Sequence, residues 1–232
     1  MANKYGPRIV TDGLVLALDA ADKNSYPGSG SGWYDLSGNS NHCTLTNSPS
    51  FSNNNGGKII LDGINDWIAT SFNPNINNNR LLTMEIWFRD DSPGISSSTN
   101  TALISNYGPN STTPFINMHI TSEGKINLSE RNSLGTQSSY GLSSVVTDGG
   151  WKQIVGSCNS SQLTLSINAV ISYAVNRVGG TITSGQNWVI GGNHLGRYQS
   201  CDISIVRVYL DKALSAEEIK QNYDSTKSRY NL

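Results

Sequence analysis

The chain has 232 residues, of which 14% are charged, and its formal net charge is −1. So few charges in near balance exclude a global field that would attract nucleic acid or an anionic membrane surface. No apolar run approaches the ~18 residues that a membrane-spanning helix needs, and the length suits one large domain.

The N-terminal segment Met1–Asp12 is polar apart from Ile9 and Val10. It lacks the apolar stretch of a secretory signal peptide, so we expect a protein that is made in a cytoplasm and is not exported by general secretion. We interpret residues 1–12 as an N-terminal arm and residues 13–232 as a single domain.

Strand patterns dominate the remaining chain. The clearest is Leu82–Arg89, in which every second residue from Leu82 to Phe88 is apolar, as is typical of a β-strand. Together these strands, about a dozen joined by turn-forming stretches, predict an antiparallel β-sandwich. The other predicted strands are Gly13–Asp19, Lys58–Leu61, Trp67–Thr70, Ala102–Ser105, Phe115–Ile120, Lys125–Ser129, Trp151–Cys158, Leu163–Asn168, Asn187–Gly191 and Asp202–Leu210.

The last of these strands is predicted to be buried on both faces. In Asp202–Leu210 we place Ile203 and Ile205 on one face and the apolar residues from Val206 to Leu210 on the other. Strands covered on both faces read as continuous apolar runs, as this one does.

A helix is predicted after that strand. Ser215 is its N-cap, Glu218 completes a capping box, and Leu214 and Ile219 occupy the positions of a hydrophobic staple. Three basic residues are interpreted as a solvent-exposed helix face and as partners of the helix dipole: Lys220, Lys227 and Arg229.

The turn between Asp62 and Trp67 concentrates oxygen ligands. Asp62, Asn65 and Asp66 lie within five residues, and Ca²⁺ binds several oxygens from a short loop. Tight hairpin turns prefer the same residue types, however, and the spacing of an EF-hand is missing. Calcium at these three residues is therefore the minority interpretation, and no other cofactor is expected. The three cysteines and three histidines are too scattered for a zinc site.

The sequence contains no recognisable catalytic grouping. A glycosidase needs two acids that flank the scissile bond, whereas Glu85 is followed by Trp87 at i+2 and Arg89 at i+4. Asp90 would project from the opposite face of the strand. We interpret Glu85 as a structural hydrogen-bond acceptor and expect no enzyme, with a glycoside hydrolase as a remote alternative.

Five segments nevertheless occur in an informative order: Gly13–Asn47, Gly56–Ile68, Leu82–Phe88, Trp151–Ser157 with Leu163–Ile171, and Asp202–Tyr223. Together they resemble the concanavalin A-like, laminin-G-type jelly roll of the sort found in virion proteins of tailed bacteriophages. The resemblance covers nearly the whole chain. It implies an all-β, antiparallel sandwich with one short C-terminal α-helix. Because lectins, hydrolases and structural modules share this scaffold, the resemblance is less specific for function.

The resemblance implies two alternative functions. The first is a non-enzymatic virion structural protein, a capsid decoration or surface module that contacts other capsid or tail proteins and is oligomeric on the particle. The second is a tail-associated adhesin that binds host surface glycan. We favour the first, because only about a dozen residues precede the first strand, which leaves little room for a separate attachment segment. Nucleic acid and membranes are not expected as partners.

Loop residues supply the candidate glycan site. Aromatic rings stack on the C–H surfaces of sugars, while amide and guanidinium groups bind hydroxyls. The candidates are Tyr107, Asn110, Tyr140, Asn193, His194, Arg197 and Tyr198.

Overall fold

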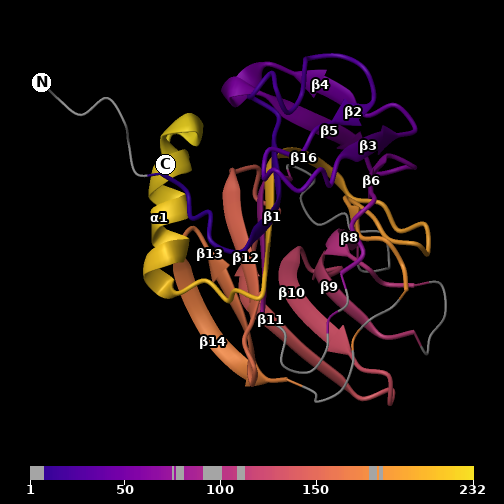
Figure 1. The fold of residues 1–232 in the computed structure, drawn as a ribbon, viewed down its shortest axis with the longest axis vertical. Helices are drawn as coiled ribbons and strands as arrows, with labels where there is room; N and C mark the ends of the chain where they lie inside the picture. The colour runs from indigo at the N-terminus through magenta and orange to yellow at the C-terminus, as the bar shows by residue number, and fades with distance from the viewer. Residues whose placement is uncertain are drawn as a thin grey trace, which may run out of the picture.

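The computed structural model describes residues 8–74, 76, 81–90, 101–108, 113–177, 182 and 185–232. Within these residues the chain forms two antiparallel β-sheets, packed as a sandwich, and one short α-helix near the C-terminus (Figure 1). The predicted fold class is confirmed. No helix in this part of the chain is long and apolar enough to cross a membrane.

The first sheet, sheet A, has eight strands in the order β14-β13-β12-β7-β16-β5-β4, with β1 paired to the C-terminal part of β16. Its strands are β1 (Leu14–Asp19), β4 (Ser50–Ser52), β5 (Lys58–Asp62), β7 (Leu82–Arg89), β12 (Lys152–Cys158), β13 (Gln162–Ile167), β14 (Val170–Asn176) and β16 (Ser200–Leu210).

The second sheet, sheet B, also has eight strands, in the order β11-β10-β9-β8-β15-β6-β3-β2. Its strands are β2 (Gly32–Trp33), β3 (Cys43–Thr46), β6 (Trp67–Thr70), β8 (Thr101–Ser105), β9 (Phe115–Ile120), β10 (Lys125–Arg131), β11 (Gln137–Val145) and β15 (Val189–Ile190). Helix α1 spans Ala216–Thr226, and two 3₁₀ turns, η1 and η2, span Asn54–Gly56 and Lys227–Tyr230.

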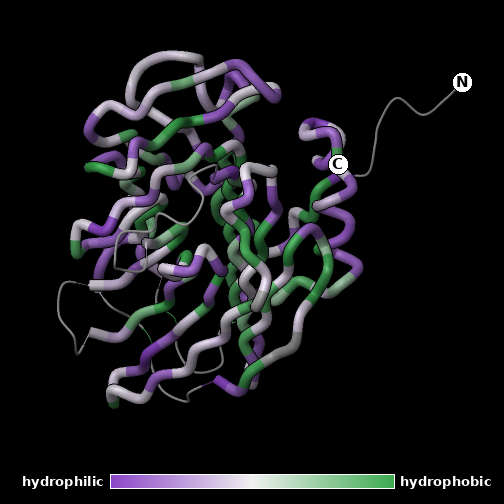
Figure 2. Tube along the Cα trace, turned by 180° about the vertical axis from the view of Figure 1, so that it is seen from behind, coloured by the Kyte–Doolittle hydropathy of each residue, from purple (hydrophilic) through white to green (hydrophobic). Residues whose placement is uncertain are grey.

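The main hydrophobic core lies between the two sheets. On β7, the alternate residues from Leu82 to Phe88 all belong to it, as the sequence pattern predicts. Trp33, at the end of β2, is wholly buried in the same cluster. Figure 2 shows the hydrophobic segments gathered along the strands in the middle of the molecule.

Strand β16 departs from the predicted pattern at a β-bulge. The register of β16 against β7 shifts between Ile203 and Ile205. Ile203 therefore packs into the core between the sheets, whereas Ile205 packs against Trp87 on the outer face of sheet A. The prediction that the two isoleucines share a face was wrong, because the extra residue of a bulge reverses the alternation.

Helix α1 covers the outer face of sheet A. The Ser215 hydroxyl accepts a hydrogen bond from the N–H of Glu218, whose carboxylate accepts one from the N–H of Ser215. Leu214 and Ile219 are buried in one cluster with Tyr209 of β16. The predicted capping box is confirmed, and both residues of the predicted staple are buried together.

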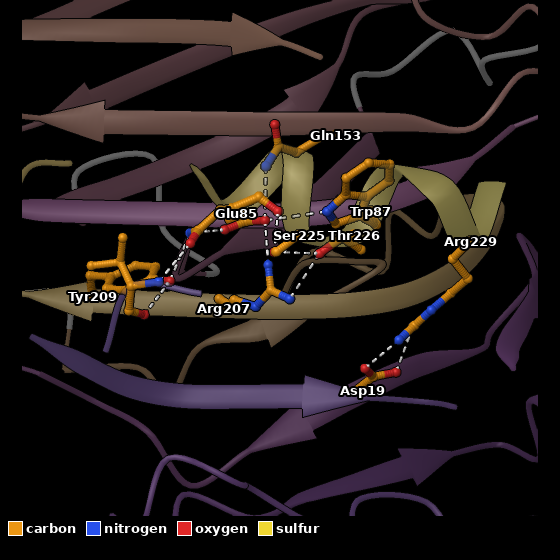
Figure 3. Close-up of polar contacts among 11 residues, drawn as sticks. Asp19, Glu85, Trp87, Gln153, Arg207, Tyr209, Ser225, Thr226 and Arg229 are labelled. Atoms are coloured by element: carbon orange, nitrogen blue, oxygen red, sulfur yellow. Dashed lines mark hydrogen bonds and ion pairs between the residues drawn. The ribbon is translucent and has the colours of Figure 1, made fainter. Parts of the chain in front are cut away.

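The three basic residues that were predicted to be solvent-exposed are not all so. Arg229 of η2 donates two hydrogen bonds to the carboxylate of Asp19 on β1, at 2.7 and 2.8 Å (Figure 3). The predicted exposed role of Arg229 was therefore wrong, since this ion pair ties the C-terminal turn to sheet A. Lys220 and Lys227 pair with Asp224 on the helix surface.

A buried polar network joins α1 to sheet A (Figure 3). Its centre is Glu85, whose Oε1 accepts hydrogen bonds from Arg207 at 2.6 Å, Gln153 at 3.0 Å and the Trp87 indole at 3.2 Å. Asn222 of α1 donates to Oε2 at 2.8 Å. The interpretation of Glu85 as a structural acceptor is confirmed.

Residues 8–10 of the predicted arm lie against α1. The N–H of Val10 donates to the side chain of Asn222 at 2.8 Å, and the Tyr209 hydroxyl donates to the carbonyl of Val10 at 3.1 Å. This part of the arm is thus anchored to the domain, and residues 1–7 lie outside the described residues.

Candidate functional site

A polar groove opens on the outer face of sheet B. Helix α1 lies on the other side of the sandwich, against sheet A (Figure 1). Strands β9, β10 and β11 form its floor, and the loops after β8 and β15 form its walls. The groove has a volume of about 220 Å³. We call it the sheet-B groove, and define it by its lining residues: Tyr107, Phe115, Asn117, His119, Thr121, Asn127, Ser129, Gln137, Ser139, Asn193 and Arg197.

Strand alternation makes the floor polar. On β9, Ile116, Met118 and Ile120 point into the core, so Asn117 and His119 point into the groove. A strand with one apolar and one polar face is what a sheet with a single buried side requires.

Antiparallel pairing then places polar side chains side by side. Ser129 of β10 lies opposite Asn117 on one side and opposite Ser139 of β11 on the other. Asn127 lies opposite His119, and its Oδ1 accepts a hydrogen bond from the Ser139 hydroxyl at 2.8 Å. The floor is consequently a patch of amides, hydroxyls and one imidazole.

One wall of the groove is aromatic. The rings of Tyr107 and Phe115 pack with their centroids 4.6 Å apart. The guanidinium carbon of Arg131 lies 4.9 Å from the Phe115 centroid, and the same group donates hydrogen bonds to the carbonyl of Thr113. These contacts hold Tyr107, which is partly exposed, in one position.

The opposite wall is an ordered loop. The side-chain Oδ1 of Asn193 accepts hydrogen bonds from the N–H groups of Leu195 at 2.9 Å and Arg197 at 3.4 Å. Gly191 begins the loop with φ of +74°, and a Cβ there would lie 2.0 Å from a methyl carbon of Leu61. The loop therefore fixes the backbone of Arg197 at the groove.

The imidazole of His119 is neutral at pH 7. Burial is the main cause that lowers its pKa, to about 4, and the nearby charge of Arg197 lowers it as well. The amide Nδ2 of Asn117 lies 3.2 Å from Nδ1 of His119. The ring is thus an uncharged part of the groove floor.

Asn117 carries an unsatisfied acceptor. Its Oδ1 atom is buried and has no hydrogen-bond partner within the described part of the chain. A buried acceptor without a partner costs about 1–3 kcal/mol of folding free energy.

Three of the predicted glycan residues line the groove, namely Tyr107, Asn193 and Arg197. Tyr140 does not, because it lies opposite Leu128 on the core side of β11. Asn110 lies outside the described residues.

The other two predicted residues brace the loop after β15. The Nε2 atom of His194 lies 2.8 Å from the carbonyl oxygen of Asn187, and the ring packs edge-on against Trp67. Tyr198 packs over Gly192, where a Cβ would lie 3.0 Å from its ring. Neither residue lines the sheet-B groove.

The residues of the groove floor were missed by sequence reasoning. The available signal was the pattern Phe115–Ile120, in which Asn117 and His119 alternate with apolar residues. That pattern identifies an outward polar face, but partner strands distant in sequence are needed to turn it into a groove.

The predicted calcium residues form a hydrogen-bonded turn between β5 and β6. One Asp62 oxygen accepts from the N–H groups of Ile64, Asn65 and Asp66, and Asp66 accepts from the N–H of Asp62. The bond from Ile64 is the main cause that lowers the pKa of Asp62, whereas burial raises the pKa of Asp66. Within the described residues no cluster of three or more His, Cys, Asp or Glu side chains could hold a metal ion.

Glu85 is not placed for glycosidase chemistry. Its side chain is wholly buried beneath α1, and both of its oxygens accept hydrogen bonds from protein groups. A general acid or nucleophile has to reach the substrate, which this carboxylate does not.

Comparison with known proteins shows that the groove lies within a domain of a known family. The family model described as the concanavalin A-like lectin/glucanases superfamily (Laminin_G_3) matches residues 62–220, a range that includes every groove residue. No curated protein gives a significant sequence match.

Solved structures agree on the fold. The binding domain of Paraclostridial Mosquitocidal Protein 1 superposes with a TM-score of 0.74 at 16% identity, over 93% of this chain and 52% of that chain. The binding domain of botulinum neurotoxin serotype D gives a TM-score of 0.74 at 16% identity, over 92% and 51%. The serotype D ligand-binding domain in complex with N-acetylneuraminic acid gives 0.67 at 16% identity, over 92% and 51%. The chain thus spans about half the length of these structures, and resembles binding domains of toxins in its fold.

Proposed function

Because the chain belongs to the concanavalin A-like lectin/glucanase superfamily, we propose that it is a non-enzymatic saccharide-binding module that uses the sheet-B groove. The observation that carries the proposal is the composition of the groove: a floor of amides and hydroxyls beside a fixed aromatic ring.

Each of these groups has a counterpart in a sugar. Hydroxyls of the sugar can exchange hydrogen bonds with the accessible amides of Asn127 and Gln137 and with the hydroxyl of Ser139. The partly exposed ring of Tyr107 offers a face to the C–H surface of a pyranose. The order imposed by Asn193 and Arg131 lowers the entropy lost on binding, because the walls are already in place.

The similar toxin domains support this proposal at the level of the fold. They are binding or receptor-binding domains, and one of them is in complex with N-acetylneuraminic acid. Their sequence identity to this chain is too low to carry residues across, so the argument rests on the groove.

The biological setting that we propose is the particle of a tailed bacteriophage. Its support is the resemblance of five ordered sequence segments to virion proteins of such phages. The groove favours an adhesin that binds host glycan over a capsid decoration protein, since a purely structural module has no need of an ordered polar groove. Location in an assembled particle tests this: copies at the tail agree with adhesion, and regular copies on the capsid lattice support decoration.

A glycan array tests saccharide binding itself. The chain is applied with and without calcium, alongside two variants of exposed serines on β11, Ser139→Trp and Ser144→Trp. Only Ser139 lines the groove, so we expect Ser139→Trp to fill it and abolish binding, while Ser144→Trp binds like the parent chain.

Two results would contradict the proposal. The first is an array without bound glycan under either calcium condition. The second is equal binding by the two tryptophan variants, which would place any saccharide outside the groove. Matched melting temperatures of the variants exclude misfolding as the cause of lost binding.

A further inference from the structure

We propose that the saccharide bound by the sheet-B groove is anionic, and that Arg197 is the residue that binds its acidic group; this inference rests on the proposed saccharide-binding function. The observation behind it is a charge imbalance in the groove: a guanidinium faces a lining without any carboxylate among its described residues.

Arg197 is unpaired in the part of the chain that the structure describes. Its backbone N–H is held by Asn193, but its guanidinium has neither a hydrogen bond nor an ion pair there. Its charge nevertheless acts inside the groove, since it lowers the pKa of the buried His119. A positive charge that neighbours a partly buried cavity and lacks a counter-ion favours an anionic ligand.

Two carboxylates on the described part of β10 and the turn before it are already paired. Glu123 pairs with Lys125 at the end of the floor. Glu130 pairs with Arg177 at 3.0 Å on the core side of β10, and its side chain is wholly buried. Neither is therefore available to neutralise Arg197.

Arg131 has a different role from Arg197. Its guanidinium donates a hydrogen bond to the Thr113 carbonyl and lies over the rings of Tyr107 and Phe115, and it does not line the groove. Arg197 is the charged side chain among the described lining residues, because the pKa of His119 keeps its ring neutral at pH 7.

The guanidinium suits this role by geometry. Its planar fork donates two parallel hydrogen bonds to a carboxylate or a sulfate, and such charge-assisted bonds are stronger than bonds to a neutral hydroxyl. Because the Asn193 turn fixes the Arg197 backbone, less ordering is needed when the acid binds. The neutral amides of the floor would contact the hydroxyls of the same sugar.

The experiment compares acidic glycans with uncharged partners that share the same sugar skeleton. Sialylated and uronic-acid glycans are paired with their methyl esters, and sulfated glycans with their unsulfated forms. Titration calorimetry measures the affinity for each glycan of the parent chain, Arg197→Gln, Arg197→Lys and a control. The control is Arg8→Gln, which removes an exposed arginine beside α1. We expect at least about tenfold tighter binding of the acidic member, because a hydrogen bond to a charged group exceeds a neutral one by roughly that factor.

Arg197→Gln should abolish this preference and Arg197→Lys should retain part of it, whereas Arg8→Gln should leave it unchanged. A preference limited to the esterified pairs identifies a carboxylate, and one limited to the sulfated pairs identifies a sulfate. If the acidic and the uncharged glycan of each pair bind equally well, the inference is wrong but saccharide binding stands. The same conclusion follows if Arg197→Gln still prefers the acidic glycan. Absence of binding to every glycan overturns the proposed function as well.

Discussion

His119 is a histidine whose charged form is poorly solvated in the folded chain. Burial lowers its pKa from the ordinary value of 6.5 to about 4. As the pH falls below 6.5, the ring takes up a proton in the unfolded chain but stays neutral in the folded one until about pH 4. The unfolded state therefore binds more protons in this window, and the free energy of unfolding decreases as the pH falls.

We predict that His119→Gln removes this contribution. Between pH 6.5 and pH 4, the free energy of unfolding of the parent chain should fall by up to roughly 3 kcal/mol more than that of the variant. Urea denaturation at a series of pH values measures both. Parallel pH dependences would contradict a buried, neutral ring.

Single residues also show what the sequence could reveal of the site. Tyr107, Asn193 and Arg197 could be predicted because loop aromatics, amides and guanidiniums are typical sugar-binding groups. Tyr140 belongs to the same chemical class, yet its position on β11 turns it into the core. Whether a single aromatic side chain points into the core or to the surface depends on the strand register, which the sequence around Tyr140 does not determine.

At the scale of elements, β7 and α1 were predictable from local patterns. The apolar alternation of β7 and the capping box of α1 are short-range signals, and the structure contains both. Strands β11 and β14 were missed, since QSSYGLSSV and VISYAVN lack a clear alternation. The bulge of β16 was missed because it follows from pairing with β7, which is distant in sequence.

Helix α1 is attached to sheet A through buried charge. Glu85 and Arg207 pair at 2.6 Å, with side chains 0% and 7% exposed. Removing one partner of a buried ion pair leaves an uncompensated charge, whereas removing both does not. Both partners bond to the helix, because Asn222 of α1 donates to Glu85 and Arg207 donates to Thr226 of α1, so loss of one partner also disturbs the contact between α1 and sheet A.

We predict that Glu85→Gln lowers the free energy of unfolding by about 3–5 kcal/mol. Adding Arg207→Met to this variant should restore a large part of that loss, because no buried charge then remains without a partner. Urea denaturation of the two variants, followed through tryptophan fluorescence, gives both values. A loss below about 1 kcal/mol in Glu85→Gln would contradict the structural role of the pair.

At the scale of the whole molecule, the two outer faces of the sandwich differ. On sheet A, α1 covers the outer face (Figure 1). Trp87 on that face stacks on Tyr223 and Tyr230. On sheet B, the outer face carries the groove. The outer face of sheet A is therefore covered by contacts that stabilise the fold, whereas the outer face of sheet B is open to a ligand.

Location of the bound saccharide tests this account most directly. The measurement is an NMR titration of the ¹⁵N-labelled chain with the tightest-binding glycan of the array, which follows backbone amides, Asn and Gln side-chain amides and the Arg Nε–H groups. We predict that the shifts gather at Asn117, Asn127, Asn193 and Arg197, and that the signals of α1 stay in place. Shifts that instead gather on α1, or in loops away from the groove, would contradict the central claim that the outer face of sheet B binds the saccharide.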